Sequence, residues 1–174
     1  YASIIAYDLV GNVSSFIASD GILIDLVLPE VSQIDDGTLN EDIDWQSDAT
    51  TAMLNWIGSD TRDLANYEVS LGTSPGLKDI VAWQDVGITT SHQFMALSLQ
   101  QDVSYYGNVR AYDDAGNVSV VTSSDGFGID QSPPTISYVW DGWGADVQYQ
   151  NFMDSVKVQF NAPPDDYSGI DFYE

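Results

Sequence analysis

The sequence contains no cysteine and very few positive charges. Of its 174 residues, four are Lys or Arg and one is His, against 27 Asp and Glu. The lack of Cys excludes disulfide bonds, thiolate metal sites and cysteine nucleophiles. The formal net charge of -23 leaves no basic patch that could neutralise phosphates, so we expect no nucleic-acid partner.

Long apolar runs and helical periodicity are also missing. No stretch approaches the roughly 18 consecutive apolar residues that a bilayer-spanning helix needs, so we expect no direct membrane insertion. The apolar residues come in short alternating runs, separated by Gly, Asp, Asn and Pro, a pattern typical of strands and turns. With 44% hydrophobic and 12% aromatic residues there is enough apolar material for packed cores, and we predict an all-β fold.

An internal repeat organises the chain. Residues 1–37 align without gaps on residues 106–142, at an offset of 105, with nearly half of the positions identical. The shared text includes AYD, GNVS, SDG and a closing DG. The match continues, after a slip of one residue, between residues 41–56 and 145–160.

A period of about 105 residues is too long for a solenoid and is typical of separate units, each with its own core. We call this repeating unit a module. We predict that residues 1–29 are the C-terminal strands of a truncated module, that 30–131 form a complete β-sandwich of about seven strands, and that 132–174 are the N-terminal strands of a third. The chain would then be a stretch of a longer polypeptide.

The strands predicted inside the complete module are defined by alternation. Ala52, Leu54 and Trp56 should share one strand face. Tyr67, Val69 and Leu71 should share the next, and so should Tyr105, Gly107, Val109 and Ala111. Shorter strands are expected at 80–83, 94–99 and 118–122. Trp45, Trp56 and Trp83 are expected in the core or at its edge.

Several of these residues resemble the fibronectin type III family of Ig-like β-sandwiches. Trp56 stands at the family's strand B position, and Leu99 precedes Tyr105 by the six residues that the family places between a Leu and a corner Tyr. The chain departs from the family at Gln101, where Pro is common, and in the acidic stretch Asp35–Asp48. The fuller pattern, with DIDWQ, YEVSLGTSPG and YYGNVRAYDDAGNVS, looks like repeats of very large secreted and surface proteins, notably adhesins of gliding bacteria of the Bacteroidetes type. That resemblance implies an extracellular location at the cell surface.

The sequence shows no catalytic constellation. His92 is the only His, so a Ser-His-Asp triad would have to use it, and no nucleophile motif lies near it. Phosphate loops, dinucleotide fingerprints and zinc spacings do not occur. We therefore expect that the chain is not an enzyme.

Acidic residues that recur between the copies are candidate Ca²⁺ ligands, because Ca²⁺ requires carboxylate and carbonyl oxygens. In an Ig-like sandwich, the loop between the first two strands lies near the exit of the last strand. We therefore predict Ca²⁺ at a module junction. The candidate ligands are Asp35, Asp36, Glu41, Asp42, Asp125 and Asp130. The alternative is that Asp-Gly pairs such as Asp36-Gly37 and Asp125-Gly126 are only turn residues.

Trp140 and Trp143 are the aromatic residues expected to be most exposed. Two indole rings beside an Asp could stack on a sugar, or they could cover a junction between modules.

Two functions follow from these patterns. The first is a non-catalytic stalk or spacer of a large surface adhesin, whose partners are the neighbouring modules of the same chain. The second is a module that binds surface carbohydrates or proteins, appended to a secreted protein.

Overall fold

Strands and loops make up the part of the chain that the computed structural model describes, which is residues 1–38, 41–142, 144–151, 154–161, 165 and 167–174. No helix occurs among these residues, so none of them forms a segment with the helical length and apolarity that a bilayer crossing requires. The strands in order are β1 Ser3–Ile4, β2 Ile17–Ala18, β3 Glu30–Asp36, β4 Trp45–Gln46, β5 Ala52–Ser59, β6 Leu64–Gly72, β7 Val81–Asp85, β8 Ser91–Phe94, β9 Ser104–Asp113, β10 Thr122–Ser123, β11 Phe127–Ile129, β12 Val139–Asp141 and β13 Val158–Phe160. The predicted all-β fold is confirmed.

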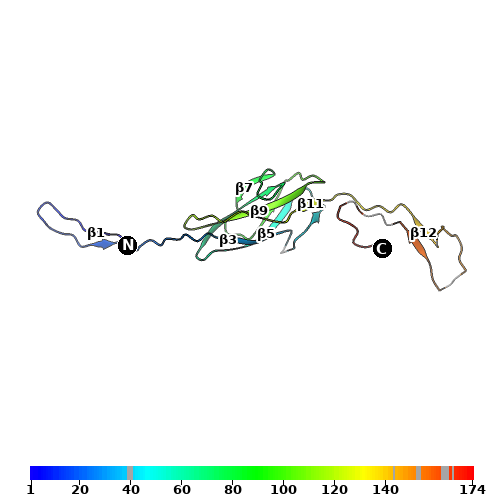
Figure 1. Ribbon diagram of the computed structural model, residues 1–174, viewed down its shortest axis with the longest axis horizontal. Coiled ribbons are helices and arrows are strands. Elements are labelled where there is room, and N and C mark those ends of the chain that lie inside the picture. The colour runs from blue at the N-terminus through cyan, green and yellow to red at the C-terminus, as the bar shows by residue number, and fades with distance from the viewer. Residues whose placement is uncertain (39–40, 143, 152–153, 162–164, 166) are drawn as a thin grey trace.

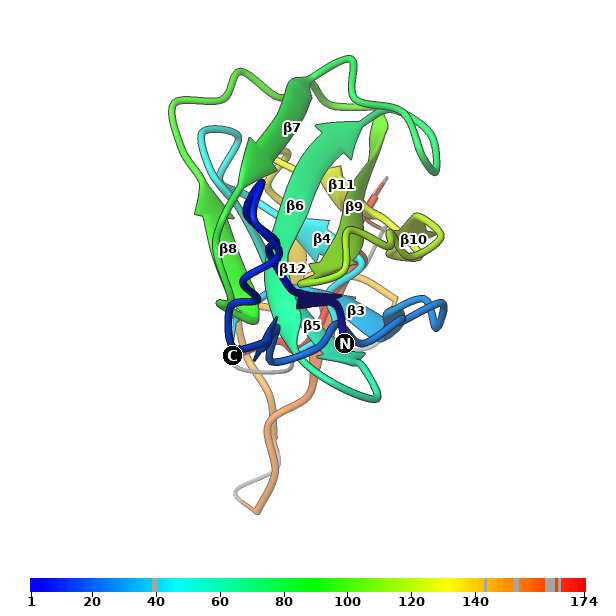
Figure 2. The ribbon, with the colours of Figure 1, turned by 90° about the vertical axis from the view of Figure 1, so that its left-hand side faces the viewer.

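Strands β3 to β11 form two facing sheets. The larger sheet has the order β4-β11-β9-β6-β7, with β10 also paired to β9, and the smaller has the order β3-β5-β8. All pairs are antiparallel except β4 with β11. Figure 2 views this β-sandwich from its N-terminal side, with β6 between β7 and β9. We call residues 30–131 the central copy.

Alternating side chains of the two sheets fill the core between them. Leu54, Val69, Leu71 and Val109 are completely buried, and each contributes about 1.5–3 kcal/mol through the hydrophobic effect. The Trp56 ring meets the Tyr67 ring edge-on, with centroids 5.6 Å apart. Within the described residues, the buried core cluster draws only on positions from Val31 to Ile129.

Gly107 illustrates how tightly the two sheets approach. It lies on β9 between the core residues Tyr105 and Val109, and a Cβ at this position would collide with the side chain of Leu54 from the facing sheet. The absence of a side chain on β9 therefore makes room for a fully buried Leu on β5.

Three sequence predictions need correction. The strand predicted at 94–99 is wrong, because β8 ends at Phe94 and Ala96 adopts a positive φ of 57°. The chain beyond it is held by Leu97 and Leu99, whose N–H groups donate to backbone carbonyls of the loop before β5. Of the strand expected at 118–122, only Thr122 lies in a strand; the last strand consists of β10 and β11 and is interrupted around Gly126, which has a φ of 99°. Trp45, expected in the core or at its edge, belongs to neither and is 40% exposed at one end of the sandwich.

Asn108 lies on the outer face of β9 and is nevertheless completely buried. The loop between β6 and β7 covers it. Its Oδ1 accepts the N–H of Gly76 at 2.6 Å and the hydroxyl of Ser123 at 2.7 Å, and its Nδ2 donates to the carbonyl of Leu77 at 2.6 Å. One side chain thus connects the β6–β7 loop to β9 and β10.

Two short hairpins flank the central copy, β1–β2 on the N-terminal side and β12–β13 on the C-terminal side. Figure 1 shows them extending from opposite ends of the sandwich. β1–β2 pairs Ser3 with Ala18, as β9–β10 pairs Asn108 with Ser123 at an offset of 105. The isolated bridge between Tyr7 and Val13 likewise has its equivalent between Tyr112 and Val118.

The C-terminal hairpin repeats a different part of the central copy. Val139 pairs with Phe160, as Ile34 pairs with Trp56 in β3–β5. Asp141 pairs with Val158, as Asp36 pairs with Leu54. Each flank therefore has the backbone register of the part of the central copy with which its sequence aligns.

Candidate cation-binding clusters

Three carboxylates meet along the edge where β3 approaches the last strand. Asp36 ends β3, Asp42 lies in the loop that follows, and Asp125 directly precedes the turn into β11. One carboxylate oxygen from each lies within 4.8 Å of the other two. We call these three residues the seam cluster.

The loop after β3 is folded so that it brings Asp42 back to Asp36. Gly37 has a φ of 133°, and a Cβ there would lie 2.6 Å from the carbonyl oxygen of Glu41. Two hydrogen bonds then close the loop: the N–H of Ile43 donates to the carbonyl of Asp36 at 2.7 Å, and the N–H of Asp36 donates to Oδ1 of Asp42 at 3.2 Å. A residue without a side chain at position 37 is required for this return.

Asp36 is the buried member of the seam cluster, with no exposed surface, whereas Asp42 and Asp125 are exposed. Its Oδ2 accepts the N–H of Gly126 at 3.1 Å, but its Oδ1 has no hydrogen-bond partner. The pKa of Asp36 is raised to about 7, mainly by burial and also by the nearby Asp42 and Asp125 carboxylates, against hydrogen bonds from Ser124 and Gly126 that lower it. The site therefore favours a proton or a cation on this carboxylate.

Two of the predicted Ca²⁺ ligands lie near this cluster but outside it. The carboxylate of Asp35 is on the neighbouring position of β3 and accepts both of its hydrogen bonds, at 2.9 Å, from the side chain of Gln33. Glu41 is exposed, and its backbone N–H donates to the carbonyl of Thr38. Successive strand residues point to opposite faces, which separates Asp35 from Asp36.

Asp130, the sixth predicted ligand, contacts the C-terminal flank instead. It follows β11 and is buried. Its Oδ2 accepts the hydroxyl of Ser168 at 2.6 Å and the Ser168 N–H at 3.1 Å, and its Oδ1 accepts the N–H of Ser132. The Ser168 hydroxyl, together with these N–H groups, lowers the pKa of Asp130.

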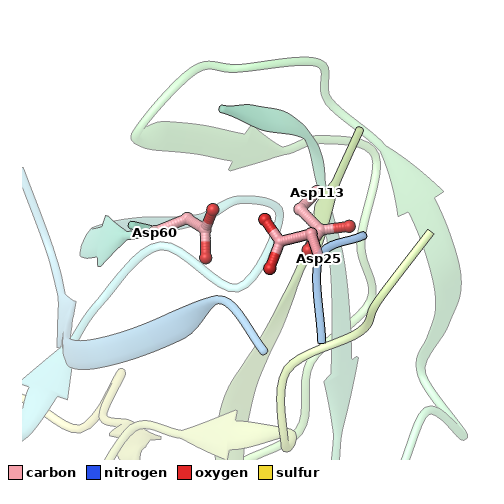
Figure 3. A group of neighbouring side chains, drawn as sticks. All are labelled: Asp25, Asp60 and Asp113. Atoms are coloured by element: carbon pink, nitrogen blue, oxygen red, sulfur yellow. The ribbon is translucent and has the colours of Figure 1, made fainter. Parts of the chain in front are cut away.

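A second group of carboxylates, Asp25, Asp60 and Asp113, lies at the N-terminal end of the sandwich, and we call it the pole cluster. Figure 3 shows the carboxylates of Asp25 and Asp113 side by side, with that of Asp60 across from them. This group has one cationic partner and one neutral amide partner, while Oδ1 of Asp60 is buried without a hydrogen-bond partner. Nε of Arg62 lies 3.2 Å from Oδ2 of Asp25, and Asp113 accepts two hydrogen bonds from Asn117.

Sequence reasoning did not single out Asp60. A signal exists, because Asp165 stands at an offset of 105 from it, but this pair lies just beyond the block that aligns residues 41–56 with 145–160. The hydroxyl of Ser168 is within hydrogen-bond distance of both Asp130 and Asp165. The pair formed by Asp25 and Asp60 at one end of the sandwich is therefore matched by Asp130 and Asp165 at the other.

The remaining candidates are placed as follows. Trp140 lies on β12, half-buried, with its ring stacked on Tyr138 at a centroid distance of 4.4 Å. Trp143 lies outside the described residues, so the predicted ligand-binding pair stays a prediction. His92 is on β8 with its ring edge-on to Phe94, and burial lowers its pKa.

No protein-family model matches the chain. Among solved structures, a protein described as "Myokine structure" is similar over 60% of this chain and 96% of its own, with 14% sequence identity and a TM-score of 0.32.

Proposed function

We propose that this chain is a stretch of a tandem array of Ig-like β-sandwich modules, and that the array is a non-catalytic stalk of a large extracellular surface adhesin. One observation carries the proposal: the hairpins in the two flanks have the strand register of the central copy, but core positions of both flanks are uncovered.

On the N-terminal side, Ile22 and Ile24 are 83% and 72% exposed. Their equivalents in the central copy, Phe127 and Ile129, are 2% and 0% exposed. On the C-terminal side the same contrast separates Val158 and Phe160, which are 58% and 39% exposed, from Leu54 and Trp56 at 0% and 3%. Side chains patterned for a core but left in solvent are what two incomplete modules would present.

The direction of the chain supports an end-to-end array. The flanks leave the sandwich at opposite ends (Figure 1), so each added module would extend the array instead of folding back on it. The formal charge of -23 favours the same outcome, because like charges on successive modules repel one another.

Direct contacts at both ends would limit bending between modules. At the N-terminal end, Arg62 pairs with Asp25, and the side chain of Asn117 donates to the carbonyls of Asp25 and Val27, each at 3.2 Å. At the C-terminal end, Asp130 accepts from Ser168. A stalk needs such contacts because a freely jointed chain of modules would not hold its tip away from the surface.

Small-angle X-ray scattering tests the stalk. A globule of 174 residues has a radius of gyration of about 16 Å, and we expect a clearly larger value for this chain. In longer arrays, the maximum particle dimension should increase by the same length for each further 105-residue copy. Arg62→Ala should broaden the distribution of distances across the N-terminal end, whereas Arg110→Ala, a change within the central copy, should not. A radius near 16 Å would refute the stalk.

The carbohydrate-binding alternative has its own readout. Glycan-array binding that is abolished by Trp140→Ala would support a ligand-binding module over a spacer. If the chain is a stalk, this variant and the unchanged chain should show the same glycan-binding pattern on the array.

A further inference from the structure

The seam cluster joins the first strand of the central copy to its last. β3 and the last strand lie along each other, since the hydroxyl of Thr122 donates to the carbonyl of Val31 at 3.0 Å. Further along the same edge, the N–H of Gly126 donates to Asp36. Asp36 and Asp42 come from the β3 side of this seam and Asp125 from the other side, so anything bound to all three carboxylates connects the two strands.

The buried oxygen of Asp36 points to a ligand. A buried carboxylate oxygen without a hydrogen-bond donor is costly, and native proteins pair such groups. Here Oδ1 of Asp36 has no partner, Asp36 has no exposed surface, and the closest charged groups are two further carboxylates. A cation bound among the three carboxylates would offset most of this negative charge.

The chemistry of the three residues selects a hard divalent cation. All donors are carboxylate oxygens, which Ca²⁺ prefers. Ca²⁺ holds its ligands at about 2.3–2.6 Å, so two ligands of one ion can be up to about 5 Å apart. The separation of at most 4.8 Å fits this limit. The exposed Asp42 and Asp125 leave one side open to water, which would complete the coordination.

Half of the same arrangement recurs in the C-terminal flank. The N–H of Asp141 donates to Oδ1 of Asp146 at 3.2 Å, as that of Asp36 does to Asp42, and the N–H of Val147 returns to the carbonyl of Asp141. In the N-terminal flank, Asp20 stands at the position of Asp125. Each flank therefore has the carboxylates that its portion of a module would supply.

We infer that the seam cluster binds Ca²⁺ through Asp36, Asp42 and Asp125, and that the ion clamps the first strand of the module to the last. The mechanical part rests on the proposed stalk function: tension along a stalk enters each module through these two strands. This site lies inside one module, whereas the sequence predicted an ion at the junction between two.

Binding is tested on the whole chain by isothermal titration with CaCl₂ after treatment with EGTA. We expect a dissociation constant of about 10⁻⁴ to 10⁻³ M, the range of extracellular modules. Asp42→Asn and Asp125→Asn, which change exposed residues, should each weaken binding at least tenfold. Asp85→Asn, which changes an exposed residue outside both clusters, is the matched control and should leave it unchanged. No heat of binding, or binding lost in the Asp85 variant and kept in the other two, would overturn the site.

Asp36→Asn gives a second measurement because it removes the buried charge with little change of shape. In EGTA its melting temperature should equal or exceed that of the unchanged chain, and in 10 mM CaCl₂ it should fall below it. If the variant melts lower in EGTA as well and Ca²⁺ shifts both chains equally, Asp36 is no ligand.

Single-molecule pulling on the two ends tests the clamp. The unfolding force of the central copy should drop when EGTA replaces Ca²⁺, and in Asp125→Asn it should be low under both conditions. Equal forces with and without Ca²⁺ would overturn the clamp. The scattering experiment judges the stalk independently, so failure of either proposal can be recognised without the other.

Discussion

Replacing Asn108 should destabilise the fold far more than a polar residue on an outer strand face normally does. Asn108→Ala removes the acceptor of the Gly76 N–H and the Ser123 hydroxyl, and the donor to the carbonyl of Leu77. Asn108→Asp keeps the shape but turns a second oxygen toward that carbonyl. We expect the Asp variant to lose at least as much stability as the Ala variant.

The magnitude follows from the partners of Asn108. Its side chain makes three hydrogen bonds between 2.6 and 2.7 Å and two longer ones, of 3.3 Å to Ser70 and 3.4 Å to the carbonyl of Tyr106. Each contributes about 0.5–1.5 kcal/mol net, and a partner left buried and unpaired costs about 1–3 kcal/mol. The N–H of Gly76 is exposed to water and also donates to the hydroxyl of Ser123, so losing its bond to Asn108 costs less than losing the others. We therefore expect a loss of about 2–4 kcal/mol, a large part of the roughly 5–15 kcal/mol that stabilises a domain.

Urea unfolding monitored by tryptophan fluorescence measures this loss. With a slope of about 2 kcal/mol per molar urea, the midpoint should fall by roughly 1–2 M while the slope stays constant. Ser123→Ala is the control, because it removes one of the short bonds and should cost about 1 kcal/mol. A loss below about 1 kcal/mol for both Asn108 variants would refute the view that this residue holds the β6–β7 loop onto the sheet.

Two further predictions concern the ends of strands β9 and β8. Tyr105→Phe removes the acceptor of the Gln100 N–H, 2.7 Å away, and should cost about 1–2 kcal/mol in the same urea assay; an unchanged midpoint would contradict it. Since burial places the folded-state pKa of His92 below 6.5, the unfolded chain binds more protons, and stability should fall as the pH is lowered from about 6.5 through the folded pKa. NMR titration of this single imidazole measures the pKa directly, and His92→Gln should flatten that part of the pH dependence; a folded pKa above 6.5 would exclude the effect.

The central strands could be predicted because the alternation of apolar and polar residues along them has a single cause, the burial of one strand face in the core. Ala52, Leu54 and Trp56 are buried on one face of β5, as two-residue periodicity requires. The same two-residue pattern did not predict burial where a loop covers the outer face of a strand. Asn108 and Ser70 are polar and stand at outward positions, yet both are completely buried, since the fold of the β6–β7 loop over them is not encoded in the period of either strand.

The candidate cation site was predicted in part. The sequence argument named Asp36, Asp42 and Asp125 because they recur, and the structure brings these three together. It also named Asp130, which recurs, and Asp35 and Glu41, which do not recur but belong to the same acidic stretch. Neither criterion tells on which side of a strand a carboxylate points. Asp60 and Asp113 meet Asp25 only after folding joins three distant segments, and no local pattern contains that information.

The position of β9 in the larger sheet sets the order in which the module can be assembled. β9 pairs with β6, β10 and β11, so the centre of the sheet is incomplete until residue 113 has been synthesised and has emerged. Until then, β6 exposes the edge that β9 will occupy, and in a tandem chain the nearest competing strand is the closely similar one of the neighbouring copy. Differences in sequence between successive copies would therefore protect the growing chain against exchange of strands between neighbours.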